Sequence, residues 1–334
     1  MLLDKLIIDE KKINRSLYSS GPYWDYKNKR SIIEIKKKGL KDFRGVNAGI
    51  GTSFSDNLVL DVRNEFNIKG RIIGKIFSLP ILNKIFNGQL QITRNHLKSF
   101  IKNQAIVYQN STNVKNLILK YNFKDDTEFG CVQLFNHSGK SYSCYYLEMA
   151  DRIDKLSKFF NFKAIKSFFE IGGGFGANVH FLIQNFPNIR KILYLDVVPN
   201  IYVGTYYLKH HFGDKVKDYL ELNNFDKIQF SKDDDLEILC IPPWLIEKVH
   251  AEIDHFHNAA SFVEMPQQVV KNYINFIKKF KTKEISLISY DGFDQNTTFD
   301  PELLNHFFND ELNVSWQEGL IEEYNKKLIY LTSK

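Results

Sequence analysis

The feature that most constrains the fold of this chain is a glycine-rich turn between an apolar run and a helix-like segment. The turn Gly172-Gly173-Gly174-Phe175-Gly176 follows the run 167–171, whose one acidic residue is Glu170. Such a turn lets a ligand approach bare backbone, and the N–H groups at the start of the next helix point at that ligand. The following apolar run, 191–197, contains Asp196 near its end, where a carboxylate can accept both hydroxyls of a ribose. Together these features predict a nucleoside-bearing cofactor.

The glycines alone do not identify that cofactor. Gly172, Gly174 and Ala177 also satisfy the dinucleotide pattern G-x-G-x-x-G/A, which has a high false-positive rate. Glu170 argues against a dinucleotide, because a carboxylate repels a pyrophosphate but attracts the cationic amino acid end of S-adenosylmethionine. The turn also lies far along the chain, whereas many dinucleotide domains begin with it. The sequence therefore favours S-adenosylmethionine.

From residue 166 onward the chain alternates strand-like and helix-like segments, which predicts a doubly wound α/β domain. Strands are expected at 167–171, 191–197, 237–241, 253–258 and 285–290, and helices at 177–185, 202–211 and 267–280. The last apolar runs, 312–316 and 328–331, predict a terminal β-hairpin and thus a seven-stranded Rossmann-like sheet, the usual form of a class I methyltransferase domain.

An amphipathic helix expected at 145–160 leads into this domain. We therefore expect two parts: a mixed, mainly helical substrate-recognition or lid region at 1–144, and an S-adenosylmethionine-binding methyltransferase domain at 145–334.

Composition and short sequence patterns predict the cellular environment of the protein. The hydrophobic content of 43% is ordinary for a folded protein, and no apolar run is long enough for a membrane span. The N-terminus lacks the apolar core of a secretory signal, and the three cysteines lack metal-ligand spacing, which predicts reduced thiols in the cytoplasm. We expect no metal site, because Asp233-Asp234-Asp235 is interpreted as a solvated acidic turn and the adjacent His210 and His211 diverge on a helix. A divalent ion that enters with a phosphorylated substrate stays an alternative. Oligomeric state is not predicted.

The net charge of +6 is unevenly distributed: Lys and Arg exceed Asp and Glu in residues 1–150, and the reverse holds afterwards. A basic first half suggests an anionic partner, such as a phosphorylated or nucleotide-linked substrate, a membrane surface bound peripherally, or nucleic acid. A lysine-rich solvated surface explains the same counts.

Transfer of a methyl group to a hydroxyl needs alignment and a group that removes the hydroxyl proton. His257, near the end of the fourth expected strand, is the first candidate base, since neutral imidazole accepts a proton near neutral pH; a histidine bonded within the sheet is the alternative. His255 alternates to the same face and is a candidate substrate contact. Glu264 is a second candidate base, a ligand for a sugar hydroxyl, or a helix cap. Ser261 is a candidate substrate contact or a cap residue.

The loop Pro242-Pro243-Trp244 is similar to the loop of enzymes that methylate amino groups of bases. The residue before it, Ile241, cannot accept the hydrogen bond that a target amine needs, which argues against a nucleic acid substrate. We instead expect Pro242 and Trp244 to line the adenine of the cofactor.

Three motifs in this order resemble a family of bacterial sugar O-methyltransferases, which are commonly encoded with capsule, lipooligosaccharide or O-antigen genes. They are the sequence 169–176, Leu195-Asp196 with Pro199 and Tyr206-Tyr207-Leu208, and Asp254 and Asn258 with Ser261-Phe262-Val263-Glu264-Met265. The resemblance covers roughly residues 140–290, about half of the chain.

The resemblance implies a class I fold, S-adenosylmethionine as donor, and a sugar hydroxyl of a surface polysaccharide or its nucleotide- or lipid-linked precursor as acceptor. It implies that the methionine part is held by Glu170, Gly172, Gly173 and Gly174, that the ribose binds Asp196, and that the loop from Asn258 to Met265 lines the reaction centre. Val197 and Asn258 are further candidate cofactor contacts. His255 and His257 depart from the apolar residues usual in the family, which makes Glu264 a rival base.

Two other functions remain open from the sequence. One is methylation of a natural-product hydroxyl. The other is a noncatalytic protein that binds the cofactor within a glycan assembly complex and does not turn it over.

Overall fold

The computed structural model describes residues 1–40, 43–44, 114–123, 130, 135–137, 140–292, 297–312, 314–323 and 326–333. These residues form two compact units, one joining Met1–Lys29 to Glu148–Lys334 and the other spanning Arg30–Leu147. The second boundary lies close to the expected division at 144/145. The first 29 residues, which the sequence places in the N-terminal region, group with residues Glu148–Lys334.

The unit Arg30–Leu147 contains α7 (Val114–Lys120) and an antiparallel pair of strands, β1 (Phe135–His137) and β2 (Lys140–Tyr142). Arg44 is fully buried, and its guanidinium lies 5.8 Å from the ring centre of Tyr146, a cation–π contact. Most of the expected lid region lies outside the described residues, so its role in substrate recognition stays a prediction.

The larger unit is built on an eight-stranded sheet in the order β5-β6-β4-β3-β7-β8-β10-β9. Its strands are β3 (Ser167–Ile171), β4 (Lys191–Leu195), β5 (Val216–Lys217), β6 (Glu237–Ile241), β7 (His255–Ala259), β8 (Glu284–Tyr290), β9 (Gln317–Glu323) and β10 (Lys326–Ser333). The pairs from β5 to β8 are parallel, and β10 runs antiparallel to both β8 and β9. The chain builds outward from β3 first through β4 and later through β7, so the strand order reverses at β3. Ligands of doubly wound sheets bind at such a reversal, beyond the carboxyl ends of the strands.

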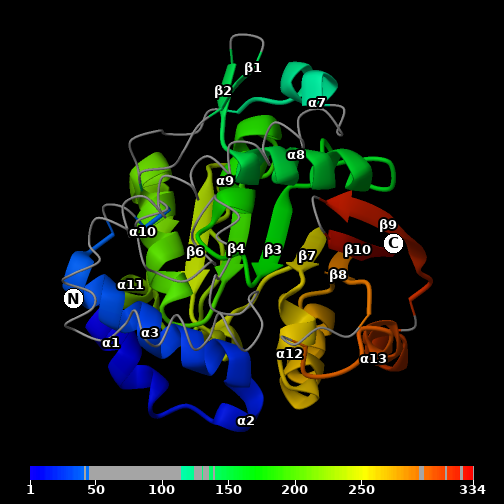
Figure 1. Ribbon diagram of the computed structural model, residues 1–334. Helices are drawn as coiled ribbons and strands as arrows, with labels where there is room; N and C mark the ends of the chain where they lie inside the picture. Colours follow the sequence, from blue (N-terminus) through cyan, green and yellow to red (C-terminus); the bar gives the residue numbers. More distant parts are fainter. Residues whose placement is uncertain are drawn as a thin grey trace, which may run out of the picture. The chain divides into compact units, whose positions relative to one another are not determined.

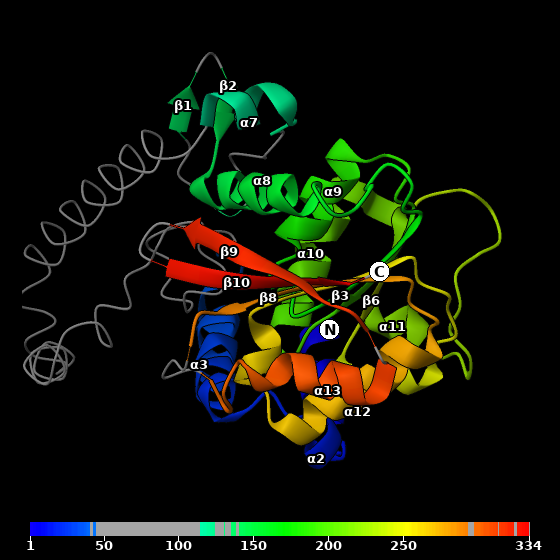
Figure 2. The same cartoon turned by 90° about the vertical axis from the view of Figure 1, so that its right-hand side faces the viewer.

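Helices cover both faces of this sheet (Figures 1 and 2). On one face lie α9 (Ala177–Asn185) and α10 (Asn200–Phe212), where the β4 residue Tyr194 packs so closely that a side chain at Gly204 of α10 would strike its ring. On the other lie α12 (Gln267–Lys279) and α13 (Leu303–Leu312), and Phe169 of β3 packs against Phe280 there, at 5.7 Å between ring centres. The helix α8 (Cys144–Leu156) crosses the unit boundary, and α11 (Tyr219–Leu222) is a single turn. The doubly wound α/β class is thus confirmed.

The N-terminal segment packs onto the same unit through α1 (Leu2–Glu10), α2 (Arg15–Tyr18) and the start of α3 (Pro22–Lys38). Leu3 and Leu6 of α1 are buried. The Tyr18 hydroxyl donates to Glu247 at 2.6 Å, and Asn272 of α12 donates to the Leu17 carbonyl at 3.2 Å. These contacts join residues far apart in sequence and hold the segment against the sheet domain.

Most expected elements are confirmed, three of them with the predicted bounds: 167–171, 177–185 and 237–241. The strand predicted at 312–316 is wrong. Leu312 ends α13, whose buried Leu304, Phe307 and Phe308 have helical spacing, and the strand begins only at Gln317. The sheet also has one strand more than predicted, the short edge strand β5.

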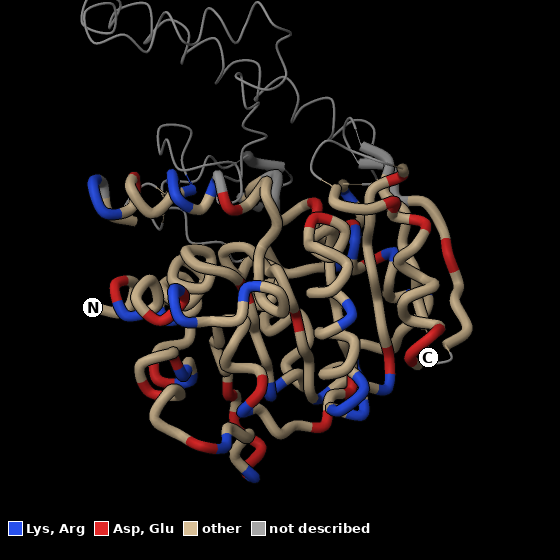
Figure 3. The backbone as a smooth tube through the Cα atoms, turned by 90° about the horizontal axis from the view of Figure 1, so that it is seen from below, with Lys and Arg blue, Asp and Glu red and all other residues tan. Residues whose placement is uncertain are grey.

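Other expectations concern charge, membranes and thiols. Figure 3 shows both charge signs interspersed along the described backbone; the basic first half falls largely outside the described residues. No helix within the described ranges is long and apolar enough to cross a membrane. Cys240 is buried as a free thiol, whereas the side chains of Cys131 and Cys144 lie outside what the structure describes.

Candidate functional site

A pocket of about 390 Å³, part of it open to solvent, lies at the carboxyl ends of β3 and β4. The strand ends and the glycine turn supply one wall, and residues from α2–α3, α10, the loop after β7 and α12 supply the rest. The lining consists of Ser20, Trp24, Ile171, Gly172, Leu195, Asp196, Val197, Asn200, Ser261, Met265 and Tyr273. Of the predicted residues, the pocket therefore brings together Gly172, Asp196, Val197 and Ser261.

The glycine turn needs its glycines for two physical reasons. Gly172 has a φ of +76°, in the left-handed region, and its N–H donates to the Leu195 carbonyl at 2.9 Å, which fastens the turn to β4. A Cβ at this position would strike the hydroxyl of Ser261. A Cβ at Gly173 would strike a carboxylate oxygen of Glu170. The turn is thus packed tightly enough that its backbone itself borders the pocket.

Asp196 connects the turn to the pocket. One carboxylate oxygen accepts the N–H of Gly174 at 2.8 Å and the other accepts the N–H of Val197 at 2.7 Å. The side chain is 3% exposed. Burial raises the pKa of Asp196 to about 7, although hydrogen bonds from Gly174, Val197 and Asn200 oppose the rise; the nearby charge of Glu264 adds to it. The turn and Asp196 are therefore neighbours, as the sequence suggested, and the ribose role of Asp196 stays a prediction.

Glu170 carries the most unusual oxygen of the site. Its Oε1 accepts a hydrogen bond from the amide of Asn178 in α9 at 2.7 Å, while its Oε2 is buried and has no hydrogen-bond partner among the residues that the structure describes. Burial raises the pKa of Glu170 to about 7; the charge of Asp196 acts in the same direction and that of Arg152 opposes it. A buried carboxylate oxygen without a donor is costly, and a cationic or hydrogen-bond-donating ligand would relieve that cost.

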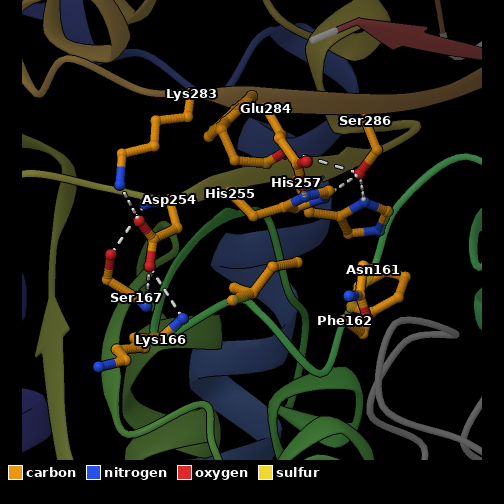
Figure 4. Close-up of polar contacts among 12 residues, drawn as sticks. Asn161, Phe162, Lys166, Ser167, Asp254, His255, His257, Lys283, Glu284 and Ser286 are labelled. Carbon is orange, nitrogen blue, oxygen red and sulfur yellow. Dashed lines mark hydrogen bonds and ion pairs between the residues drawn. The ribbon is translucent and has the colours of Figure 1, made fainter.

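The side chains of the two histidines of β7 lie on the same face of the sheet, and Ser286 of β8 connects them (Figure 4). The Ser286 hydroxyl lies 2.7 Å from His255 Nε2 and 2.8 Å from His257 Nδ1. His255 Nδ1 lies 3.4 Å from the carboxylate of Glu284. His255 is 0% exposed and its ring stacks on Phe168, with 5.5 Å between centres.

This chain of contacts assigns the ring protons. Because the Glu284 carboxylate can only accept a hydrogen bond, His255 Nδ1 carries the hydrogen. Burial lowers the pKa of His255, so the ring is neutral, and its unprotonated Nε2 accepts a hydrogen bond from the Ser286 hydroxyl. The Ser286 oxygen in turn accepts from His257 Nδ1–H, which leaves His257 Nε2 as the unprotonated nitrogen. Burial, His255 and Arg152 lower the pKa of His257 to about 3. His257 is thus neutral but a weak base.

Neither histidine belongs to the pocket lining. His257 is 4% exposed. His255 is enclosed by aromatic side chains, with Phe160 edge-on at 4.6 Å, and pairs in register with Phe168 near the beginning of β3. Its contact with the substrate stays a prediction, since the structure places its ring among aromatic side chains and not in the pocket lining.

Asn258 and Ser261 form the junction between β7 and the pocket. The Asn258 amide donates to the Ile171 carbonyl at 2.9 Å and to the Ser261 hydroxyl at 2.6 Å, and its oxygen accepts the N–H of Phe262 at 3.1 Å. Asn258 is 1% exposed. It therefore fastens the loop after β7 to the end of β3, and Ser261 is the member of this pair that lines the pocket.

Glu264 is held from two sides. The indole N–H of Trp24 donates to its Oε2 at 2.6 Å, and the Tyr290 hydroxyl donates to its Oε1 at 2.7 Å. The Glu264 side chain is 5% exposed and does not line the pocket, whereas Trp24 does. Both the catalytic and the capping roles considered for Glu264 stay predictions.

The predicted adenine wall lies on η3 (Pro243–Lys248), which directly follows Pro242. Trp244 packs edge-on against Tyr219 at 5.8 Å, and its N–H donates to the Tyr219 hydroxyl at 3.3 Å. Neither Pro242 nor Trp244 lines the pocket, so their contact with adenine stays a prediction. Within the described ranges, no group of three or more His, Cys, Asp or Glu side chains is placed to hold a metal ion.

Sequence reasoning missed several pocket residues, namely Ser20, Trp24, Asn200 and Tyr273. A signal existed for Asn200, which follows Asp196 and Pro199 at the start of a helix. Ser20, Trp24 and Tyr273 come from segments whose proximity to the turn arises only in the folded chain.

Comparisons with known proteins identify no family. No protein-family profile and no curated protein sequence matches this chain. Solved structures similar to it include the mitomycin 7-O-methyltransferase (TM-score 0.41, 12% identity, 57% of this chain and 55% of that chain). They also include magnesium protoporphyrin IX methyltransferase from Synechocystis PCC 6803 with bound SAM (0.39, 9%, 57% and 79%) and the pyocyanin biosynthetic protein PhzM (0.35, 11%, 57% and 58%). The matched region spans little more than half of the first of these proteins.

Proposed function

We propose that this protein is an S-adenosylmethionine-dependent O-methyltransferase that acts in the cytoplasm on a sugar hydroxyl of a bacterial surface polysaccharide or its nucleotide- or lipid-linked precursor. The observation that carries the proposal is the pocket at the strand reversal, which is lined by the buried carboxyl of Asp196 and by the glycine turn. Glu170, next to that turn in the sequence, is a second buried carboxyl that does not itself line the pocket, and one of its oxygens has no donor among the described residues. The motif resemblance supports the sugar acceptor.

The residues present fit the cofactor. Glu170 would attract the cationic methionine end, the backbone of the glycine turn would border it, and Asp196 would accept from the ribose. Two buried carboxyls repel a pyrophosphate, which disfavours a dinucleotide. When bound, S-adenosylmethionine supplies a methyl carbon on a sulfonium, a good leaving group, so the protein has mainly to align the acceptor oxygen with that carbon.

The geometry favours alignment over strong base catalysis. His257 has a pKa of about 3, so it takes up a proton weakly near neutral pH. Both oxygens of Glu264 already accept hydrogen bonds. The two residues stay the candidates for proton removal, and the pH–rate profiles of His257→Asn and Glu264→Gln would distinguish them.

A natural-product hydroxyl is the second candidate acceptor, because Trp24 and Tyr273 give the pocket aromatic walls that also suit a flat ring. Transfer assays with methyl-labelled cofactor test both classes: purified protein is offered glycan precursors and, separately, plant or bacterial phenols. Labelled glycan that disappears with Asp196→Ala supports the proposal. Cofactor binding without transfer to any acceptor would instead support the noncatalytic role, and labelled phenol alone would support the second candidate.

A further inference from the structure

The pocket has two sides of different chemistry. The side made by the ends of β3 and β4 carries the buried carboxyl of Asp196, and Glu170 of β3 is buried without lining the pocket. The other side is contributed in part by the N-terminal segment, through Ser20 and Trp24. Trp24 lies in the first turn of α3 and belongs to the same compact unit as the strands, although it precedes Glu264 by 240 residues.

Several contacts fix the place of Trp24. The carboxylate of Asp25, the next residue, accepts from Arg15 at 2.6 Å and from the Ser20 hydroxyl at 2.9 Å. Gly21 has a φ of +85°, and a Cβ there would lie 2.5 Å from the Glu264 carbonyl oxygen, so the two backbones are in contact. The bond from the indole N–H to the Glu264 carboxylate then sets the rotation of the ring. A charge-assisted hydrogen bond of this kind is among the stronger ones.

We infer that Trp24 is the wall of the pocket against which the acceptor lies, and that Glu264 is the positioning residue that orients the indole. The inference rests on the proposed function. The indole offers a broad apolar surface that matches the C–H face of a sugar ring, and the hydroxyls of Ser20 and Ser261 in the same lining match its polar edge. The buried carboxyls of Glu170 and Asp196 repel a negative charge, so the part of the acceptor inside the pocket is neutral.

The inference assigns Glu264 a role different from a general base. Because Glu264 does not line the pocket and Trp24 does, the carboxylate acts through the indole. Glu264→Gln should then weaken acceptor binding, raise KM, and leave the shape of the pH–rate profile unchanged. Loss of a general base would lower kcat and remove a titration from that profile.

The test monitors the NMR signal of the Trp24 indole N–H in the intact protein. Full-length protein labelled with ¹⁵N-tryptophan has three indole N–H signals, from Trp24, Trp244 and Trp316, which the three Trp→Phe variants assign. The protein is saturated with S-adenosylhomocysteine and then titrated with the methyl α-glycosides of glucose, mannose and rhamnose, and separately with catechol. Trp316, whose indole bonds Asn309, is the internal control.

We expect at least one glycoside to shift the Trp24 signal saturably at millimolar concentration while the Trp316 signal stays in place, and Glu264→Gln to weaken that binding about tenfold. Trp24→Phe should weaken glycoside binding but leave the dissociation constant of S-adenosylhomocysteine within about threefold. If S-adenosylhomocysteine binds but no glycoside moves the Trp24 signal, or only catechol does, the inference is overturned and the cofactor assignment stands. If S-adenosylhomocysteine itself does not bind, the proposed function fails, and this inference with it.

Discussion

Replacement of Glu170 by glutamine should make the free protein more stable at high pH while it weakens cofactor binding. Burial raises the pKa of Glu170 from its ordinary value of 4.5 to about 7, so the folded state holds this proton more tightly than the unfolded state. The contribution of the group to stability is therefore fully present below the unfolded pKa and is lost as the pH rises through about 7. Glutamine does not titrate and avoids this loss.

The magnitude follows from the two pKa values. Above both of them the ionised Glu170 costs the fold about 3 kcal/mol, and at about pH 5 it costs about 1 kcal/mol. The amide of glutamine brings its own cost, because its N–H groups replace the unpartnered oxygen, but that cost is the same at every pH. The stability difference between Glu170→Gln and the parent protein should thus grow by about 2 kcal/mol between about pH 5 and pH 8.

Urea denaturation at the two pH values measures this difference, with the free energies taken from midpoints and slopes. Glu302→Gln, which removes an exposed carboxyl from the same unit, is the matched control and should show no such growth. S-adenosylhomocysteine should bind Glu170→Gln at least about tenfold more weakly, since its ammonium loses a charged partner. An equal stability difference at both pH values would refute the reasoning, because Glu170 would then be ionised without penalty.

The other predictions concern the turn, the sheet and the pH. Gly172→Ala should cost about 1 kcal/mol for its positive φ and about 1–3 kcal/mol more for the clash with the neighbouring serine. Gly39→Ala, at a φ of +70° and with no described atom within 4 Å of the added Cβ, should cost only the first part in urea denaturation. Ser286→Ala should lower the free energy of unfolding by about 2 kcal/mol, because two buried histidines lose a partner, and ¹⁵N spectra should show altered ring tautomers. Affinity for S-adenosylhomocysteine in calorimetry should rise with pH through about 7, as Glu170 and Asp196 ionise; a flat profile would contradict the raised pKa values.

The fold was largely predictable because its strong elements follow local patterns. The strands 167–171 and 237–241 are mostly apolar runs next to turns, and in each of them the last four residues are buried, as in buried parallel strands. The position of strand β9 was predicted wrongly, because β9 lies at the sheet edge and its first residues, Gln317, Glu318 and Gly319, show little apolar alternation. The nearby run at 312–316 matched the expected strand pattern better, although Leu312 is the last residue of α13.

The site was only half predictable. The turn and Asp196 carry local signals, and the structure brings them together through the N–H of Gly174. Trp24 carries no local signal, since its place in the pocket depends on a hydrogen bond across 240 residues. For His257, alternation predicts the same face of the strand as for His255, but only the folded structure shows that His257 is 4% exposed and outside the pocket lining.

Calorimetric titration with S-adenosylmethionine and S-adenosylhomocysteine is the decisive experiment for the proposal that this pocket binds the cofactor. The parent protein should bind both saturably. Asp196→Ala should weaken binding at least about tenfold, and Asp214→Ala, at an exposed position of the same unit, should not change it. Absence of binding to folded protein, or equal binding by Asp196→Ala, would contradict the assignment of this pocket to the cofactor.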